Sequence, residues 1–256
     1  MLRPRIIPSL LLYKNGLIKT KNFKIENSKY IGDPLNAVRI FNEKKADELI
    51  LTDISATKNG TEPDFDLIEK IAYECRMPFC YGGGIKNLNH IKDLISLGVE
   101  KVSISSSAIK NFSLIADASK VVGNQSIVLV LDIKKHWLKR EFEIFTHNGT
   151  KKTGLTLNKF LDDIKQLEIG ELVINSIEND GMMLGMDEEL INLVYKKVTI
   201  PTTFIGGIGS QEDIKSIINS YGIIGVGVGS LFVFKGKYRA VLINYPNKTE
   251  KENIYS

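Results

Sequence analysis

The stretch ELILTDI at residues 48–54 recurs as ELVINSI at residues 171–177, which lie 123 positions further along the chain. The tripeptide Gly-Gly-Ile at residues 83–85 recurs at residues 206–208 with the same separation. Two matches at one separation indicate an internal duplication. Each copy opens with a short apolar segment rich in Ile and Leu, which is typical of a buried strand. We therefore expect two similar halves that contribute matching strands to one structure.

Short apolar segments predict eight strands in all. They lie at residues 5–11, 48–53, 78–81, 101–105, 126–132, 171–176, 201–205 and 222–228. Amphipathic stretches between them predict helices, for example at residues 64–75 and at residues 87–97, where Asn87 is a suitable N-cap. Eight strands that alternate with helices favour an α/β fold of the (β/α)8 TIM-barrel type. A doubly wound open sheet is the alternative.

The duplication also bears on domain organisation. Either half alone would expose sheet edges and core, so we expect one barrel over residues 1–246, with half-barrels at about 1–124 and 125–246. Pro246 and the polar residues after it disfavour a long final helix. We therefore expect residues 247–256 to form a polar C-terminal tail.

Composition excludes several classes of protein. The 256 residues are 43% hydrophobic and 25% charged, as in ordinary soluble proteins. The two cysteines, Cys75 and Cys80, are too few for a disulfide scaffold and fit a reducing cytoplasm. The first apolar segment contains Pro8 and is too short to span a membrane. The net charge of +4 is spread along the chain, so we expect no nucleic-acid or membrane partner.

Two inserts interrupt the alternation of strands and helices. Residues 13–23 follow the first strand, and residues 136–153 follow the fifth. The second insert alternates polar and apolar residues, and its Asn148-Gly149 pair predicts a hairpin turn. Both inserts follow strand ends, and this is the face on which barrel enzymes carry their active sites.

Small residues end four strands at matching places in the two halves. These are Gly83 and Gly84 after the third strand, Ser105 and Ser106 after the fourth, Gly206 and Gly207 after the seventh, and Gly229 and Ser230 after the eighth. Such residues let backbone N–H groups approach an anion closely. They predict two phosphate cradles on opposite sides of the barrel mouth, and therefore a ligand that carries a phosphate at each end. The alternative is that these glycines only shape tight turns.

Asp132 ends the fifth strand and is the candidate catalytic residue, because a carboxylate there can exchange protons with a ligand. Its counterpart in the first half is Leu11, which cannot. Asp53 and Asp180 also lie near strand ends, where they either contact the ligand or cap a loop. Lys19 in the first insert is placed to close over a phosphate. The histidines lack metal-ligand spacing, so we expect no metal or cofactor and assign them surface or hydrogen-bonding roles.

Charged residues begin four of the predicted strands. They are Arg5, Glu48, Lys101 and Glu171. In a closed barrel, residues at strand starts can point into the base of the pore, where two acids and two bases could form a ring of salt bridges. The alternative is four ordinary exposed charges at loop ends.

Over almost its whole length the chain resembles the HisF family, the cyclase subunit of imidazole glycerol phosphate synthase. The resemblance rests on RIIP at residues 5–8, GDP at 32–34, DEL at 47–49, GGGI at 82–85, KVSI at 101–104 and NDG at 179–181. The sister isomerase of histidine synthesis shares the half-barrel repeat. The four charges at the strand starts favour HisF, because they match the gate through which ammonia enters the barrel in that family.

This resemblance implies a mechanism and a partner. A HisH-like glutaminase docks on the barrel as a heterodimer and releases ammonia, which passes along the barrel axis. A bisphosphorylated substrate waits between the two cradles, to which Lys19, Asp53 and Asp180 contribute. Aspartates at the ends of strands one and five carry out the acid–base steps, and Asp132 matches the second of them.

The chain departs from the family at the first aspartate, which is replaced by Leu11. Thr20 and Met182 replace a usual glycine and a usual threonine, and residues 235–246 replace the last amphipathic helix. These departures resemble HisF paralogues of surface-polysaccharide and flagellin-glycan gene clusters. Those proteins work with a HisH-like glutaminase and a separate amidotransferase that makes acetamidino sugars.

Three hypotheses follow. In the first, the chain delivers ammonia for amidination of an acetamido sugar in surface-glycan biosynthesis. In the second, it is a genuine cyclase of histidine biosynthesis that relies on Asp132. In the third, it is a non-catalytic, phosphate-binding scaffold for the glutaminase. The sequence does not distinguish the substrate.

Overall fold

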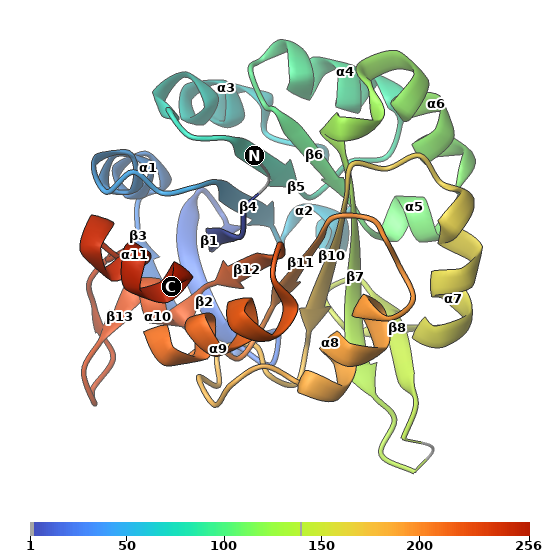
Figure 1. Cartoon of the computed structure of the whole chain (residues 1–256). Coiled ribbons are helices and arrows are strands. Elements are labelled where there is room, and N and C mark those ends of the chain that lie inside the picture. The colour runs from blue at the N-terminus through green and yellow to red at the C-terminus, as the bar shows by residue number, and fades with distance from the viewer. Residues whose placement is uncertain (1–2, 139) are drawn as a thin grey trace.

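The computed structural model describes residues 3–138 and 140–256; Met1, Leu2 and Lys139, which fall in the predicted barrel and second insert, lie outside the described residues. Eight parallel strands form a closed barrel, as predicted (Figure 1). They are β1 (Arg5–Tyr13), β4 (Leu49–Asp53), β5 (Phe79–Gly82), β6 (Lys101–Ile104), β7 (Ile127–Lys135), β10 (Glu171–Ser176), β11 (Thr202–Ile205) and β12 (Gly225–Val228). Each overlaps a predicted strand.

Strand order shows how the barrel closes. Neighbouring strands pair in the order β10, β11, β12, β1, β4, β5, β6 and β7, and β7 also pairs with β10. The repeated segments therefore form β4 and β10, which lie four strands apart on opposite sides of the barrel. We call the end at which the parallel strands finish the mouth, and the end at which they start the base.

Helices surround the barrel and bury their apolar faces against it (Figure 1). The helices between barrel strands are α1 (Pro34–Glu43), α2 (Ala56–Asn59), α3 (Phe65–Glu74), α4 (Leu88–Ser96), α5 (Ser106–Lys110), α6 (Ser113–Val122), α7 (Leu157–Asp163), α8 (Glu188–Tyr195) and α9 (Gln211–Tyr221), with short 3-10 turns η1 (Asn124–Ser126) and η2 (Ile164–Gln166). Asn87 caps α4 as predicted, since its side chain accepts a hydrogen bond from the backbone N–H of His90 at 3.0 Å. Among the described residues, no helix is long and apolar enough to cross a membrane.

The first insert forms a hairpin that the sequence did not predict. Its strands β2 (Gly16–Lys21) and β3 (Lys24–Gly32) pair antiparallel with each other, and β2 also pairs with β1. The two turns use Lys14-Asn15 and Asn22-Phe23, and all four residues have positive φ angles. The first turn contains an Asn15-Gly16 pair, the hairpin signal also present at residues 148–149, whereas the second turn has no glycine and gives no such signal. We call residues 13–32 the β2–β3 arm.

The second insert forms the predicted hairpin. Strand β7 continues past the barrel and pairs antiparallel with β8 (Phe142–Thr146), which pairs with β9 (Lys151–Thr156). The turn from β8 to β9 contains Asn148 and Gly149, both with positive φ, as the Asn-Gly signal predicted. We call residues 133–156 the β7–β9 arm.

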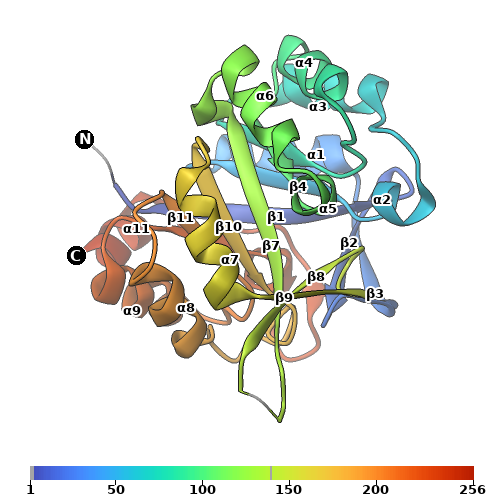
Figure 2. The same ribbon diagram turned by 90° about the vertical axis from the view of Figure 1, so that its right-hand side faces the viewer.

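The C-terminal segment differs from the predicted polar tail. After α10 (Ser230–Val233), strands β13 (Phe234–Lys235) and β14 (Ala240–Val241) pair, and we call residues 234–241 the β13–β14 arm. Residues 248–255 then form a helix, α11 (Lys248–Tyr255), which packs against α9. In Figure 2 both chain ends lie on one side with α11, whereas β2 and β3 lie on the other.

Helix α11 forms although its sequence is mostly polar. Asn247 caps it, and Ile254 is buried. The Lys251 Nζ and Tyr255 hydroxyl groups donate to the two carboxylate oxygens of Asp47 at 2.6 and 2.7 Å. A few specific contacts thus stabilise this short helix, and its apolar periodicity is too weak to reveal them.

Candidate active site at the barrel mouth

A cavity of about 530 Å³ opens at the mouth. Eight of the predicted site residues line it: Lys19, Asp53, Gly83, Gly84, Ser105, Ser106, Asp132 and Asp180. Four others do not line it: Gly206, Gly207, Gly229 and Ser230. The cavity therefore includes the first predicted phosphate cradle and leaves out the second.

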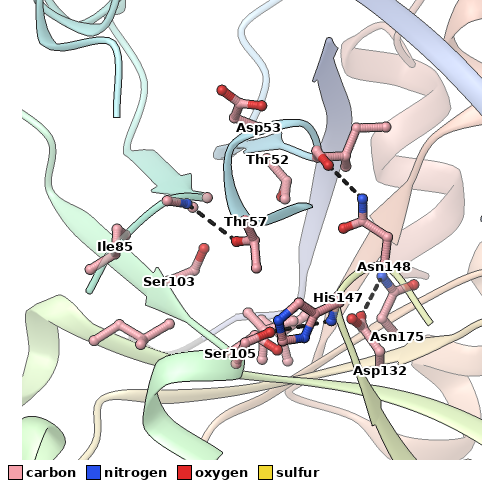
Figure 3. Close-up of a pocket in the computed structure, with 18 of the residues that line it drawn as sticks. Thr52, Asp53, Thr57, Ile85, Ser103, Ser105, Asp132, His147, Asn148 and Asn175 are labelled. Atoms are coloured by element: carbon pink, nitrogen blue, oxygen red, sulfur yellow. Dashed lines mark hydrogen bonds between the residues drawn. The ribbon is translucent and has the colours of Figure 1, made fainter. Parts of the chain in front are cut away.

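Asp132 lies on β7 and faces the cavity (Figure 3). The side-chain amide of Asn175 on β10 donates to its carboxylate at 3.4 Å. Burial raises the pKa of Asp132 to about 7, and the nearby negative charge of Asp180 adds to the rise, although the Asn175 hydrogen bond opposes it. A carboxyl group that titrates near neutrality can both accept and donate a proton, which suits general acid–base chemistry.

Leu11 occupies the position in the first half that Asp132 occupies in the second. Leu11 pairs with Thr52 across β1 and β4, and Asp132 pairs with Asn175 across β7 and β10. Thr52 and Asn175 are themselves repeat mates, since they are 123 positions apart. Leu11 also lines the cavity. Where the second half presents a carboxylate to the cavity, the first half thus presents an alkyl side chain.

The paired glycines allow neighbouring loops to pass close to the strand ends. A Cβ on Gly83 would lie 2.3 Å from the backbone oxygen of Asp53, and one on Gly206 would lie 2.8 Å from that of Ser176. A Cβ on Gly207 would lie 2.0 Å from the backbone oxygen of Gly185. All three glycines also have positive φ. Close packing against a neighbouring backbone is therefore sufficient to require glycine at these three positions.

Lys19 covers the second cradle. Its Nζ group forms an ion pair with Asp180 Oδ1 at 2.9 Å, and both side chains are almost fully buried. A Cβ placed on Gly229 would lie 2.7 Å from this Nζ. The Thr20 hydroxyl donates to the other oxygen of Asp180 at 2.6 Å. Asp180 therefore anchors the β2–β3 arm over Gly229 and holds an ammonium group beside the second cradle.

Two serine hydroxyls at the strand ends are buried without a hydrogen-bond partner among the described residues. They are those of Ser105, the N-cap residue of α5 after β6, and Ser230, the first residue of α10 after β12. Since buried polar groups are normally hydrogen-bonded, these hydroxyls are available to a ligand. The Ser106 hydroxyl instead accepts from the backbone N–H of His147 at 3.3 Å.

Asp53 has a structural role in this conformation. One of its oxygens accepts hydrogen bonds from the backbone N–H and the hydroxyl of Ser55 at 2.8 and 2.7 Å, and from the N–H of Ala56 at 3.1 Å. These bonds stabilise the turn into α2, as the capping alternative proposed for this residue.

His147 is a site residue that the sequence analysis missed. It lies in the turn between β8 and β9 and lines the cavity (Figure 3). Its neighbour Asn148 donates to the backbone oxygen of Ile54, which fixes the turn to the opposite rim. Partial burial and the positive charges of Lys110 and Lys151 lower the pKa of His147. Because these contacts join distant segments, the Asn-Gly turn signal alone could not reveal them. His90, for which a surface or hydrogen-bonding role was expected, is buried, and its Nε2 lies 3.5 Å from the Glu62 carboxylate.

The four charged residues at the base form a ring of ion pairs. Arg5 donates to Glu48 and, at 2.8 Å, to Glu171. Lys101 Nζ lies 2.7 Å from Glu48 and 2.8 Å from Glu171. Both carboxylates are buried, which rules out four separate exposed charges. Burial alone would raise the pKa of Glu171, but the hydrogen bonds and charges of Arg5 and Lys101 hold it below its usual range.

One apolar layer separates this ring from the cavity. The layer is a separate buried cluster inside the barrel, made of Ile7, Ile50, Cys80, Val128, Val173 and Ile205. Ile7, Ile50 and Val173 each follow a ring residue by two positions, so they face the same interior, because side chains alternate along a strand. Four members of the layer also line the cavity, which therefore reaches down to it.

The described residues contain no group of three or more His, Cys, Asp or Glu that could hold a metal ion. The polar groups that face the cavity are carboxylate, hydroxyl, amide, imidazole and ammonium groups of the chain itself. They are suited to binding an anion and moving a proton.

Comparison with known proteins agrees with this arrangement. Residues 5–239 match the family described as histidine biosynthesis proteins. A Leptospira borgpetersenii protein, provisionally named imidazole glycerol phosphate synthase subunit HisF, is 54% identical over 255 residues, with 100% of both chains covered. A Pseudomonas aeruginosa protein, provisionally named subunit hisF2, is 44% identical and covers 96% of this chain and 97% of its own.

More distant relatives carry the unqualified name. The imidazole glycerol phosphate synthase subunit HisF of Clostridium botulinum (strain Okra) is 36% identical over 235 residues, which are 92% of each chain. The chain therefore belongs to the histidine biosynthesis protein family, and over almost its whole length it is similar to imidazole glycerol phosphate synthase subunits HisF.

Proposed function

We propose that this chain receives ammonia from a HisH-like glutaminase and delivers it to a separate amidotransferase that amidinates an acetamido sugar in surface-glycan biosynthesis. The observation that carries the proposal is Leu11, which stands at the place that matches Asp132 in the other half. A leucine side chain can neither accept nor donate a proton, so the mouth lacks the pair of aspartates that cyclisation uses in the HisF family. Delivery of ammonia does not need that pair.

The arrangement between base and mouth supports passage of ammonia. Ammonia is small and neutral, so it can cross an apolar layer that ions cross poorly. Lys101 is partly exposed, and its long, flexible side chain can leave the ring while Arg5 remains paired with both carboxylates. On the mouth side of this layer, its residues directly line the cavity. We therefore assign Arg5, Glu48, Lys101 and Glu171 as the ammonia gate.

The phosphate cradles have a separate role in this proposal. Ser105 with Gly83 and Gly84 offers an anion site in the cavity, and Lys19 places an ammonium group beside the site at Gly229 and Ser230. The mouth thus presents its open anion site on one side. A second phosphate, at Gly229 and Ser230, would compete with Asp180 for Lys19.

A reconstitution tests the proposal. The purified chain, its glutaminase and the sugar amidotransferase of the same organism are mixed with a nucleotide-linked acetamido sugar and ATP. We expect acetamidino sugar to form from glutamine only when this chain is present, and from ammonium chloride without it. Lys101→Ala should lower the amount of product formed per glutamine hydrolysed while leaving the complex intact, because a ring without its movable side chain no longer retains ammonia inside the barrel. Glutamine-dependent product in the absence of this chain would contradict the proposal.

One observation favours a second candidate function, a genuine cyclase of histidine biosynthesis. Asp132 is retained in the cavity with a pKa near neutrality, as an acid–base catalyst requires. Its test uses ammonium salt and the bisphosphorylated substrate of the HisF family. The Leu11→Asp variant extends the test, since recovered cyclisation would show that the rest of the mouth is still competent.

A further inference from the structure

The three arms around the mouth hold most of the excess positive charge. By sequence they contain 14 of the 34 Lys and Arg residues but only 3 of the 30 Asp and Glu residues. The rest of the chain then holds 20 basic and 27 acidic residues, so it is net negative. The modest overall charge of +4 thus conceals a strong separation of charge, with the positive part on the arms.

Large apolar side chains are exposed among these basic residues. Trp137 and Leu138, at the turn from β7 to β8, are 82% and 66% exposed. Tyr238, at the turn from β13 to β14, is 88% exposed, and Leu184 in the loop after β10 is 81% exposed. Tryptophan and tyrosine are enriched in the buried centres of protein interfaces, where they carry much of the binding energy.

Hydrogen bonds fix the arms to the rim of the mouth. Arg239 in the β13–β14 arm donates to the backbone oxygen of Gly181 at 3.1 Å, and Lys29 in the β2–β3 arm donates to that of Arg239 at 2.8 Å. Asn148 ties the β7–β9 arm to the loop after β4. In both Figure 1 and Figure 2 the turn of the β7–β9 arm projects beyond the rest of the chain. The β13–β14 arm and the β8–β9 turn are thus fixed at the rim, and the β7–β8 turn with Trp137 and Leu138 projects from the fixed arm.

We infer that the arm tips form a docking surface for the ammonia-consuming enzyme, and that this partner presents an acidic surface with apolar pockets for Trp137 and Tyr238. The inference rests on the proposed function, because only an ammonia-delivering barrel needs an acceptor at its mouth. Ammonia released into water would be protonated and would cease to be a nucleophile. An enzyme seated across the arms would receive it directly from the cavity.

Charge and shape favour a protein over other occupants. A small anion would pair with the lysines but leave Trp137 and Tyr238 exposed. An anionic membrane would cover both kinds of side chain, but it would seal the mouth without supplying an acceptor. An acidic protein surface complements the arms and completes the path of ammonia.

The test uses the barrel–glutaminase complex and the purified sugar amidotransferase, with their affinity measured by sedimentation at two salt concentrations. The first variant combines Trp137→Ser with Leu138→Ser, and the second combines Lys235→Glu with Lys237→Glu. The matched controls are Tyr73→Ser and Lys70→Glu on α3, where Tyr73 is 92% exposed on the outer wall. Glutaminase activity of each complex verifies that its barrel is folded and docked at the base.

We expect each double variant to weaken binding about tenfold or more and to reduce glutamine-dependent product, while both controls match the wild type. Binding by the wild type should weaken with salt, and the second variant should lose most of that dependence. Wild-type affinity in both double variants would overturn the docking surface while leaving ammonia delivery intact. Binding of the wild type to phosphatidylglycerol vesicles, lost in the variants, with none to the amidotransferase, would overturn it in favour of a membrane. Absence of glutamine-dependent product with the wild type would instead count against the proposed function itself.

Discussion

Replacing Asp132 by asparagine tests the electrostatics of the mouth directly. The substitution keeps the size of the side chain and the oxygen that accepts from Asn175, but it removes the ionisable group. Burial raises the pKa of this carboxyl from 3.8 to about 7 in the folded protein. In the unfolded chain an aspartate titrates near its usual value of about 3.9. At pH values between these two pKa values, Asp132 therefore keeps its proton in the folded protein but has lost it in the unfolded chain.

The sign and size of the effect follow from this difference. Stability falls as the pH rises from about 4 to about 7, because over this interval the folded state binds more protons than the unfolded state. A shift of about 3 units corresponds to about 4 kcal/mol, of which about 2–3 kcal/mol is lost between pH 5 and pH 8. The asparagine variant does not incur this loss. Its advantage over the wild type should therefore be about 2–3 kcal/mol larger at pH 8 than at pH 5.

Urea denaturation followed by circular dichroism at pH 5 and pH 8 measures this difference. In thermal denaturation it corresponds to a change of about 5–10 °C in the relative Tm for a chain of this length. Asp117→Asn on the exposed side of α6 is the control for loss of one negative charge. If the difference in the free energy of unfolding between wild type and Asp132→Asn were the same at both pH values, burial would not hold the carboxyl group protonated.

Three further substitutions test other parts of the structure. Glu171→Gln should lower the free energy of unfolding by about 3 kcal/mol, because the two cations of the ring would share one buried carboxylate, and a loss below about 1 kcal/mol in urea denaturation would contradict this. Gly207→Ala should lower the free energy of unfolding by more than about 2 kcal/mol, because the added Cβ would lie 2.0 Å from a backbone oxygen. Gly154→Ala, where a Cβ meets no atom within 4 Å, should lower it by about 1 kcal/mol. Equal losses would be inconsistent with the close approach at Gly207. Tyr255→Phe should lower the free energy of unfolding by about 1–2 kcal/mol, and with it the Tm, because the Tyr255 hydroxyl donates to the buried carboxylate of Asp47. An unchanged Tm would show that α11 does not depend on that bond.

The barrel could be predicted because its strands are short, buried and repeated. Each apolar segment lies between polar stretches, and the spacing of 123 residues places β4 and β10 in equivalent positions. The four charged residues of the ring could be identified from the sequence, since each begins a predicted strand. Closure of the sheet into a barrel then brings their side chains into contact.

Other features depend on contacts that no local pattern contains. The β2–β3 arm makes its second turn at Asn22 and Phe23, which adopt positive φ without glycine. Lys19 covers Gly229 because Asp180, 161 positions away, anchors it. His147 reaches the cavity because the β7–β9 arm folds back over the rim. These features arise from tertiary packing, so they became visible only in the structure.

Leu11 stands where the HisF family has its first aspartate, so the mouth lacks a functional pair of acid–base groups. Cyclisation is measured by supplying the purified chain with ammonium salt and the bisphosphorylated substrate of the HisF family and following the formation of imidazole glycerol phosphate. We expect no product above the uncatalysed background with the wild-type chain. Turnover at a rate normal for the HisF family would show instead that the mouth cyclises without this pair.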